Sequence, residues 1–235
     1  MPPYSPALAI LTGLFELLAA AWTLNSPGRK SLLRPTAFIF ILLAGYQFAE
    51  VAVCSRPENL LFSRIAFLDI TWLPPVGIWL VYRLLAPKPR RILFPAAFIA
   101  AAVAMSAWIA LDPAAITKSV CQTVVARYFH GANFDFAFGM FYQAGMGVLI
   151  FWPALTMAGV GDANARSNLA TIQTGVLGFV LPSLFLRLFV KEPDGIMPSV
   201  MCHFAVTLAV ALTLLVSRER RLAVGEEKRI QASHA

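Results

Sequence analysis

The stretch TAFIFILLAGYQFAEVAVCS, residues 36–55, contains a single charged side chain, Glu50, among predominantly apolar residues. About 20 such residues in a helix are enough to cross the roughly 30 Å of hydrocarbon in a bilayer. Six more segments have a similar length and composition, at 6–25, 65–85, 92–111, 136–158, 169–189 and 199–217. Backbone polar groups inside lipid must pair within the protein, which favours helices. The sequence therefore predicts an all-α, polytopic membrane protein with seven transmembrane helices.

The composition of the chain excludes several classes of protein. Of its 235 residues, 59% are hydrophobic and 13% are charged, whereas a soluble domain has about 45–50% apolar and 25% charged residues. A soluble enzyme and an intrinsically disordered chain are both excluded, because disorder requires low hydrophobicity. The net charge of +7 comes in short blocks between apolar runs, a pattern typical of membrane orientation signals. We therefore expect a lipid bilayer, and no nucleic acid, as a partner.

Lysine and arginine are divided unevenly between the two sides of the predicted bundle, with 13 on one side and six on the other. The richer side holds Arg29, Lys30, Arg34, Arg83, Lys88, Arg90, Arg91, Arg166, Arg218, Arg220, Arg221, Lys228 and Arg229. The positive-inside rule places this side in the cytoplasm. We therefore predict a multi-pass protein of the bacterial cytoplasmic (inner) membrane, with its N-terminus outside and its C-terminus inside.

The predicted domain organisation is a transmembrane domain over residues 1–217 and a charged cytoplasmic tail over 218–235, which we expect to fray. The long outer connection, 112–135, has Ile116, Val120 and Val124 at i, i+4 and i+8. This spacing predicts an amphipathic helix on the outer membrane surface. In the third span, two consecutive prolines at 74 and 75 predict a kink, because proline cannot donate a backbone hydrogen bond.

Several polar side chains fall within the predicted outer half of the spans, where a charge is costly without a partner. They allow two interpretations. One is a structural ion pair between Arg187 and either Glu50 or Asp69. The other is a small-ligand or ion pocket formed by Tyr46, Glu50, Asp69, Trp72, Arg187 and His203. Glu16 stands alone near the middle of the first span, and a proton relay is one interpretation of this buried carboxyl group.

The three cysteines suggest a disulfide and a weaker metal hypothesis. Cys54 ends the second span and Cys121 lies in the outer loop, so both should face an oxidising compartment. We predict a Cys54–Cys121 disulfide, with Cys54–Cys202 as the alternative pairing. Cys202 and His203 are also candidate ligands for Cu(I) or zinc, with Cys54 or Glu50 completing the shell. The sequence identifies no cofactor.

Three short motifs, GYQFAE at 45–50, TWLPP at 71–75 and SVMCHF at 199–204, resemble those of an uncharacterised family of small seven-helix bacterial membrane proteins. In that family the second helix carries Gln-x-x-Glu-Gly, and the third has a proline break. The arrangement is also similar to the seven-transmembrane sensor region of some histidine kinases. This chain departs from the family at His203, where an aromatic residue is usual, and it lacks a kinase tail.

These observations favour a non-enzymatic, sensor- or receptor-like membrane protein. It would bind a small ligand or ion in the outer half of the bundle and act on a protein partner in the membrane or cytoplasm. Two other functions stay open. One is an accessory subunit of a larger membrane complex, and the other is a small transporter or metal-dependent membrane enzyme.

Overall fold

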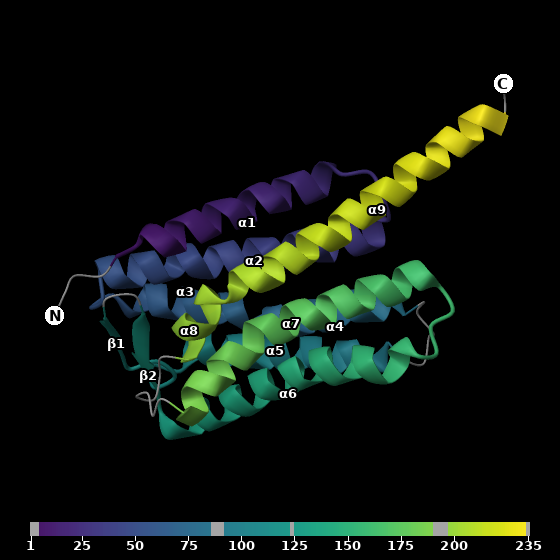
Figure 1. The fold of residues 1–235 in the computed structure, drawn as a ribbon. Coiled ribbons are helices and arrows are strands. Elements are labelled where there is room, and N and C mark those ends of the chain that lie inside the picture. Colours follow the sequence, from purple (N-terminus) through teal and green to yellow (C-terminus); the bar gives the residue numbers. More distant parts are fainter. Residues whose placement is uncertain (1–4, 86–91, 123–124, 190–196, 234–235) are drawn as a thin grey trace.

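The computed structural model describes residues 5–85, 92–122, 125–189 and 197–233, which form a bundle of long helices and one β-hairpin (Figure 1). The elements in chain order are α1 (Ala7–Asn25), α2 (Lys30–Ser55), α3 (Leu60–Thr71), α4 (Leu73–Leu84), α5 (Leu93–Leu111), β1 (Lys118–Cys121), β2 (Ala126–Phe129), α6 (Ala132–Met157), α7 (Ala163–Phe189), α8 (Met197–His203) and α9 (Ala205–Ser233). We call the end of the bundle near β1 and β2 the hairpin end, and the opposite end the tail end.

The helix α2 forms much of the core, since it packs against α1, α3 and α4. Its side chains Leu33, Phe40 and Leu43 are at most 1% exposed. Large apolar side chains elsewhere point outward, among them Leu93 of α5, which is 74% exposed, and Leu155 of α6, which is 82% exposed. Such a surface would be unfavourable in water, but it suits contact with lipid.

Six helical stretches in the described part of the chain are long and apolar enough to cross a membrane. They are Ala7–Asn25, Lys30–Ser55, Leu60–Leu84, Leu93–Leu111, Ala132–Met157 and Ala163–Phe185. This finding agrees with a multi-pass membrane protein and with the first six predicted spans. The predicted span at 199–217 covers α8 and the start of α9, which are separated at Phe204. The seventh span and the orientation of the chain therefore remain predictions.

The predicted break in the third span lies at Trp72, between α3 and α4. The backbone N–H of Trp72 still donates to the carbonyl of Asp69. Pro74 and Pro75 then occupy the first turn of α4, where a proline costs little because its missing N–H would have no partner within the helix. Two stacked helices therefore replace a single continuous one.

The predicted amphipathic helix within 112–135 is wrong, because Lys118–Cys121 and Ala126–Phe129 pair as antiparallel strands with Ser119 opposite Tyr128. Tertiary contacts hold this hairpin in place: the Ser119 hydroxyl donates to the carbonyl of Pro57 at 2.9 Å, and Cys121 is disulfide-bonded to Cys54. Along β2, Ala126 and Tyr128 are buried while Arg127 and Phe129 are only half-buried, the period-two pattern of a strand. Val124, part of the predicted helix, lies outside the described residues.

The charged tail is helical in the structure rather than frayed, because α9 continues to Ser233. Figure 1 shows α9 extending past the other helices at the tail end. Residues 220–222 and 224–232 are exposed. The helix α9 therefore extends well beyond the buried core of the bundle.

Candidate buried carboxyl site

Three acidic side chains from three consecutive helices lie inside the bundle. Glu16 of α1 is fully buried, Glu50 of α2 is 1% exposed, and Asp69 of α3 is half-buried. We call these three residues the carboxyl cluster. Carboxyl groups are rarely buried in a membrane protein unless they contact a partner or serve a function, so this cluster is the leading candidate for a functional site.

The position of Asp69 depends on a glycine in the neighbouring helix. The backbone N–H of Tyr46 donates a hydrogen bond to the Asp69 carboxyl group. A Cβ atom at Gly45 would lie only 2.5 Å from Asp69 Oδ1, which is closer than two non-bonded atoms tolerate. The absence of a side chain at Gly45 therefore lets the carboxyl group approach the backbone of α2.

Glu16 has the most unusual environment of the three acids. Neither of its carboxyl oxygens has a hydrogen-bond partner among the described residues, and the same holds for Oδ2 of Asp69. Glu16 and Asp69 also interact electrostatically. An ionised carboxylate without compensation is very costly to bury, so the bundle accommodates Glu16 most easily when its charge is neutralised.

The surrounding polar groups come from other parts of the fold. The Cys202 thiol of α8 interacts electrostatically with all three acids of the carboxyl cluster, and Tyr142 of α6 interacts with Cys202 and Asp69. The side-chain amide of Gln47 donates to the carbonyl of Cys202 at 2.8 Å, which ties α8 to α2. The site therefore involves helices from both halves of the chain.

The cluster also reaches the hairpin. Tyr46 is fully buried, interacts electrostatically with Glu50, and lies with its hydroxyl 3.4 Å from the hydroxyl of Tyr128 on β2. Nearby, His130 packs against Phe67 and Phe134. Burial lowers the pKa of His130, so this residue is neutral at neutral pH. Tyr46 therefore lies between Glu50 of the carboxyl cluster and Tyr128 of the hairpin.

Of the predicted pocket residues, the structure groups Tyr46, Glu50 and Asp69. Trp72 lines a groove of about 390 Å³ together with Arg34 and Trp79, and its place in the predicted pocket stays a prediction. His203 has its Nδ1 atom 2.8 Å from the carbonyl of Ser199, a contact within its own helix.

The remaining predicted residue, Arg187, belongs to α7, but its side chain lies outside the described residues. Its ion pair with Glu50 or Asp69 therefore stays a prediction.

The structure joins Cys54 to Cys121, the pair that the sequence analysis preferred, with their Cα atoms 5.5 Å apart. Cys202 is a buried thiol, so the alternative Cys54–Cys202 pairing does not form. The disulfide also removes Cys54 from the predicted metal set of Cys54, Cys202 and His203. Across the described part of the chain, no three histidine, cysteine or acidic side chains are arranged to hold a metal ion.

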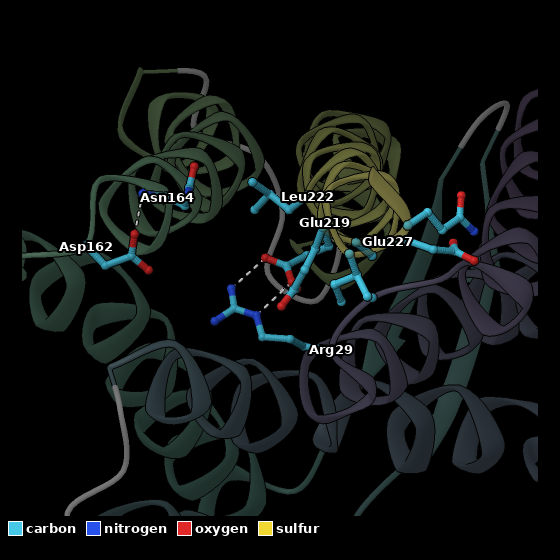
Figure 2. Close-up of a pocket in the computed structure, with 11 residues that line it drawn as sticks. Arg29, Asp162, Asn164, Glu219, Leu222 and Glu227 are labelled. Carbon is cyan, nitrogen blue, oxygen red and sulfur yellow. Dashed lines mark hydrogen bonds and ion pairs between the residues drawn. The ribbon is translucent and has the colours of Figure 1, made fainter. Parts of the chain in front are cut away.

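A second polar network, at the tail end, has no counterpart in the sequence analysis (Figure 2). Arg29 donates from Nε and an Nη atom to the two carboxyl oxygens of Glu219, at 2.8 and 2.6 Å. Asn168 donates to the same carboxyl group at 2.9 Å. This hydrogen bonding to Glu219 raises the pKa of Arg29. We call these three residues the ion-pair node; it connects α2, α7 and α9.

The backbone before Arg29 brings the connection between α1 and α2 close to the node. Gly28 has a φ of +137°, a conformation that favours glycine, and a Cβ atom there would lie 3.3 Å from the Cβ atom of Glu219. The residue of α9 before Glu219, Arg218, donates to the carbonyl of Ser167 at 3.0 Å and to the hydroxyl of Thr171. The start of the charged tail is therefore fastened to α7 as well as to α2.

Sequence reasoning missed the meeting of Glu16 with Asp69 and the pairing of Arg29 with Glu219. A signal for the second was available, since Glu219 is an isolated acid among Arg218, Arg220 and Arg221. Neither local spacing nor composition could identify its partner 190 residues away. No family model, curated protein or solved structure matches the chain. The resemblance to seven-helix membrane proteins therefore stays a prediction.

Proposed function

We propose that the protein is a sensor-like, non-enzymatic membrane protein that takes up a proton at the carboxyl cluster and changes conformation in response. The observation that carries this proposal is Glu16, whose two buried carboxyl oxygens have no hydrogen-bond partner among the described residues. A proton neutralises such a group and requires only one carboxyl group as its acceptor. A multivalent metal ion would need several converging ligands, which the described residues do not provide.

The cluster is well placed to couple protonation to conformation. Glu16, Glu50 and Asp69 lie on α1, α2 and α3, while Tyr142 and Cys202 approach from α6 and α8. Gaining or losing one charge among these groups alters the electrostatic energy between helices, because charges interact strongly where water is excluded. The proposed output is a small rearrangement of these helices, which α9 conveys to the tail end.

The proposal includes seven spans in a bacterial cytoplasmic membrane, with the hairpin end outside and the tail end inside. The uneven distribution of lysine and arginine supports this orientation. In a cysteine-free variant, Thr117→Cys, directly before β1, should react with a membrane-impermeant thiol reagent on intact cells. Gln231→Cys in α9 should react only after the cells are permeabilised. Both positions are exposed, so the reverse pattern would show that the orientation is wrong.

Protonation at Glu16 is testable with Glu16→Gln, which keeps the shape of the side chain and removes its titration. Infrared difference spectra between acidic and neutral pH should contain a carboxylic-acid carbonyl band that this variant loses. A fluorophore attached at Gln231→Cys should also change its emission with pH in the otherwise native chain, and respond much less when Glu16→Gln is added.

Two matched variants separate this site from other titrating groups. Glu58→Gln makes the same substitution at an exposed position and should leave both signals unchanged. His130→Asn removes the titratable histidine near the hairpin and should preserve the carbonyl band. If Glu16→Gln retains the band and the full emission change, Glu16 is not the proton acceptor and the proposed function fails.

A further inference from the structure

A cleft of about 770 Å³ opens at the tail end, beside the ion-pair node. Its walls are the connection between α1 and α2, the residues preceding and beginning α7, and one side of α9 (Figure 2). Arg29 forms part of the wall, but its guanidinium points toward Glu219, with which it is paired. The open volume therefore lies between α9 and the body of the bundle.

The residues that α9 contributes follow a helical repeat. Positions 219, 222, 223, 226, 227, 230 and 231 line the cleft, and their spacing of three and four residues places them on one face. The basic residues Arg220, Arg221, Lys228 and Arg229 do not belong to this lining. The tail helix therefore separates its charges, with carboxylates toward the cleft and cations on its other faces.

The lining of the cleft combines acidic and apolar side chains. Glu226 and Glu227 are exposed, and neither forms an ion pair within the described part of the chain. Asp162 adds a third carboxylate at the opposite wall, where its Oδ1 accepts the backbone N–H of Asn164. Leu222 is 43% exposed, and it provides apolar surface between the acids.

We propose that this cleft docks a basic amphipathic helix of a partner protein. Leu222, Ala223 and Ile230 place apolar side chains on this face at helical spacing, and another helix can pack against such a surface. The flanking carboxylates select lysine or arginine on that helix. They form an acidic surface on a chain whose net charge is +7. This proposal concerns an interaction surface and does not depend on proton uptake at the carboxyl cluster.

Other occupants fit the charge pattern less well. A second copy presenting the same face of α9 would bring Glu226 and Glu227 against identical acids, which is unfavourable. Anionic lipid head groups would be repelled by the same side chains. A helix with a basic polar face satisfies both the apolar and the charged parts of the lining.

The proposal can be tested with two designed peptides of about 18 residues, a length that supports a helix. Both peptides carry the same stripe of leucines. The polar face of one peptide consists of lysines, and that of the other consists of glutamates. The full-length protein would be placed in nanodiscs of zwitterionic phosphatidylcholine, and binding would be followed by the fluorescence anisotropy of the labelled peptide. We expect saturable binding of the lysine peptide above that to empty nanodiscs, and no binding of the glutamate peptide.

The decisive comparison uses substitutions on opposite faces of α9. Glu226→Gln with Glu227→Gln should weaken binding of the lysine peptide by about three- to tenfold, the effect of losing two exposed charge pairs. Arg220→Gln with Arg221→Gln alters two exposed residues outside the cleft and should not weaken it. Reversing the charges, with Glu226→Lys and Glu227→Lys, should shift the preference toward the glutamate peptide.

Two results would overturn the proposal. One is that the wild-type protein does not bind the lysine peptide. The other is equal binding to the wild type and to the Glu226→Gln, Glu227→Gln variant, which would show that the peptide contacts lipid or another surface. Self-association of the protein that disappears in this double variant would instead identify a second copy as the occupant and would likewise overturn the proposal.

Discussion

Arg29→Ala is expected to lower the free energy of unfolding by about 3 kcal/mol, the low end of the range for breaking a buried ion pair. The substitution leaves the Glu219 carboxylate, which is 2% exposed, without its cation. Asn168 still donates one hydrogen bond to that carboxylate, and the Arg29 side chain is itself 47% exposed. The loss of stability should therefore stay below the upper end of that range, about 5 kcal/mol. Equilibrium unfolding of the purified protein in mild detergent would measure the change.

The two halves of this pair should behave differently. Glu219→Gln leaves Arg29 able to turn toward water, so we expect a loss of only about 1 kcal/mol, the scale of one hydrogen bond. Arg29→Ala combined with Glu219→Gln should recover much of the stability lost by Arg29→Ala alone, because no buried charge remains. Arg220→Ala, on the exposed surface of the same helix, should stay within about 0.5 kcal/mol of the wild type. A double variant as unstable as Arg29→Ala would show that the stranded charge is not the cause.

Removing the Cys54–Cys121 disulfide is the second change for which we expect a large effect. The bond joins residues 67 positions apart, and closing a loop of that length stabilises a protein by about 2–4 kcal/mol through the unfolded state. Cys121→Ser should therefore lower the midpoint of thermal unfolding. It should also loosen the hairpin, which is otherwise held to the bundle by contacts such as Ser119 with Pro57.

Cys202→Ala provides the matched control for the disulfide. It removes the remaining thiol while leaving Cys54 and Cys121 bonded, so it should keep the sensitivity of the wild-type protein to reductant. Cys121→Ser should have no such sensitivity. Non-reducing peptide mapping should find Cys54 linked to Cys121 and Cys202 as a thiol; three thiols, or unchanged unfolding after reduction, would contradict the prediction.

Part of the carboxyl cluster and its surroundings could be predicted from the sequence. Tyr46 and Glu50 lie one helical turn apart on α2, so their shared face follows from helix geometry alone. That Asp69 joins them depends on α3 packing closely against Gly45, and that Glu16 joins them depends on the position of α1. Trp72 lies at the turn between α3 and α4 and lines a groove with Arg34 and Trp79, so its expected place in the pocket stays a prediction.

The six apolar stretches and the proline break were predictable from local sequence, because a helix in lipid pairs its backbone groups within its own segment. Segments that need distant partners were not. The outer connection has spacing compatible with an amphipathic helix, yet Lys118–Cys121 and Ala126–Phe129 form paired strands whose position depends on Pro57 and Cys54. The meeting of Arg29 with Glu219 and of Glu16 with Asp69 was likewise decided by helix packing, since the energy of a buried charge depends on neighbours brought together only in three dimensions.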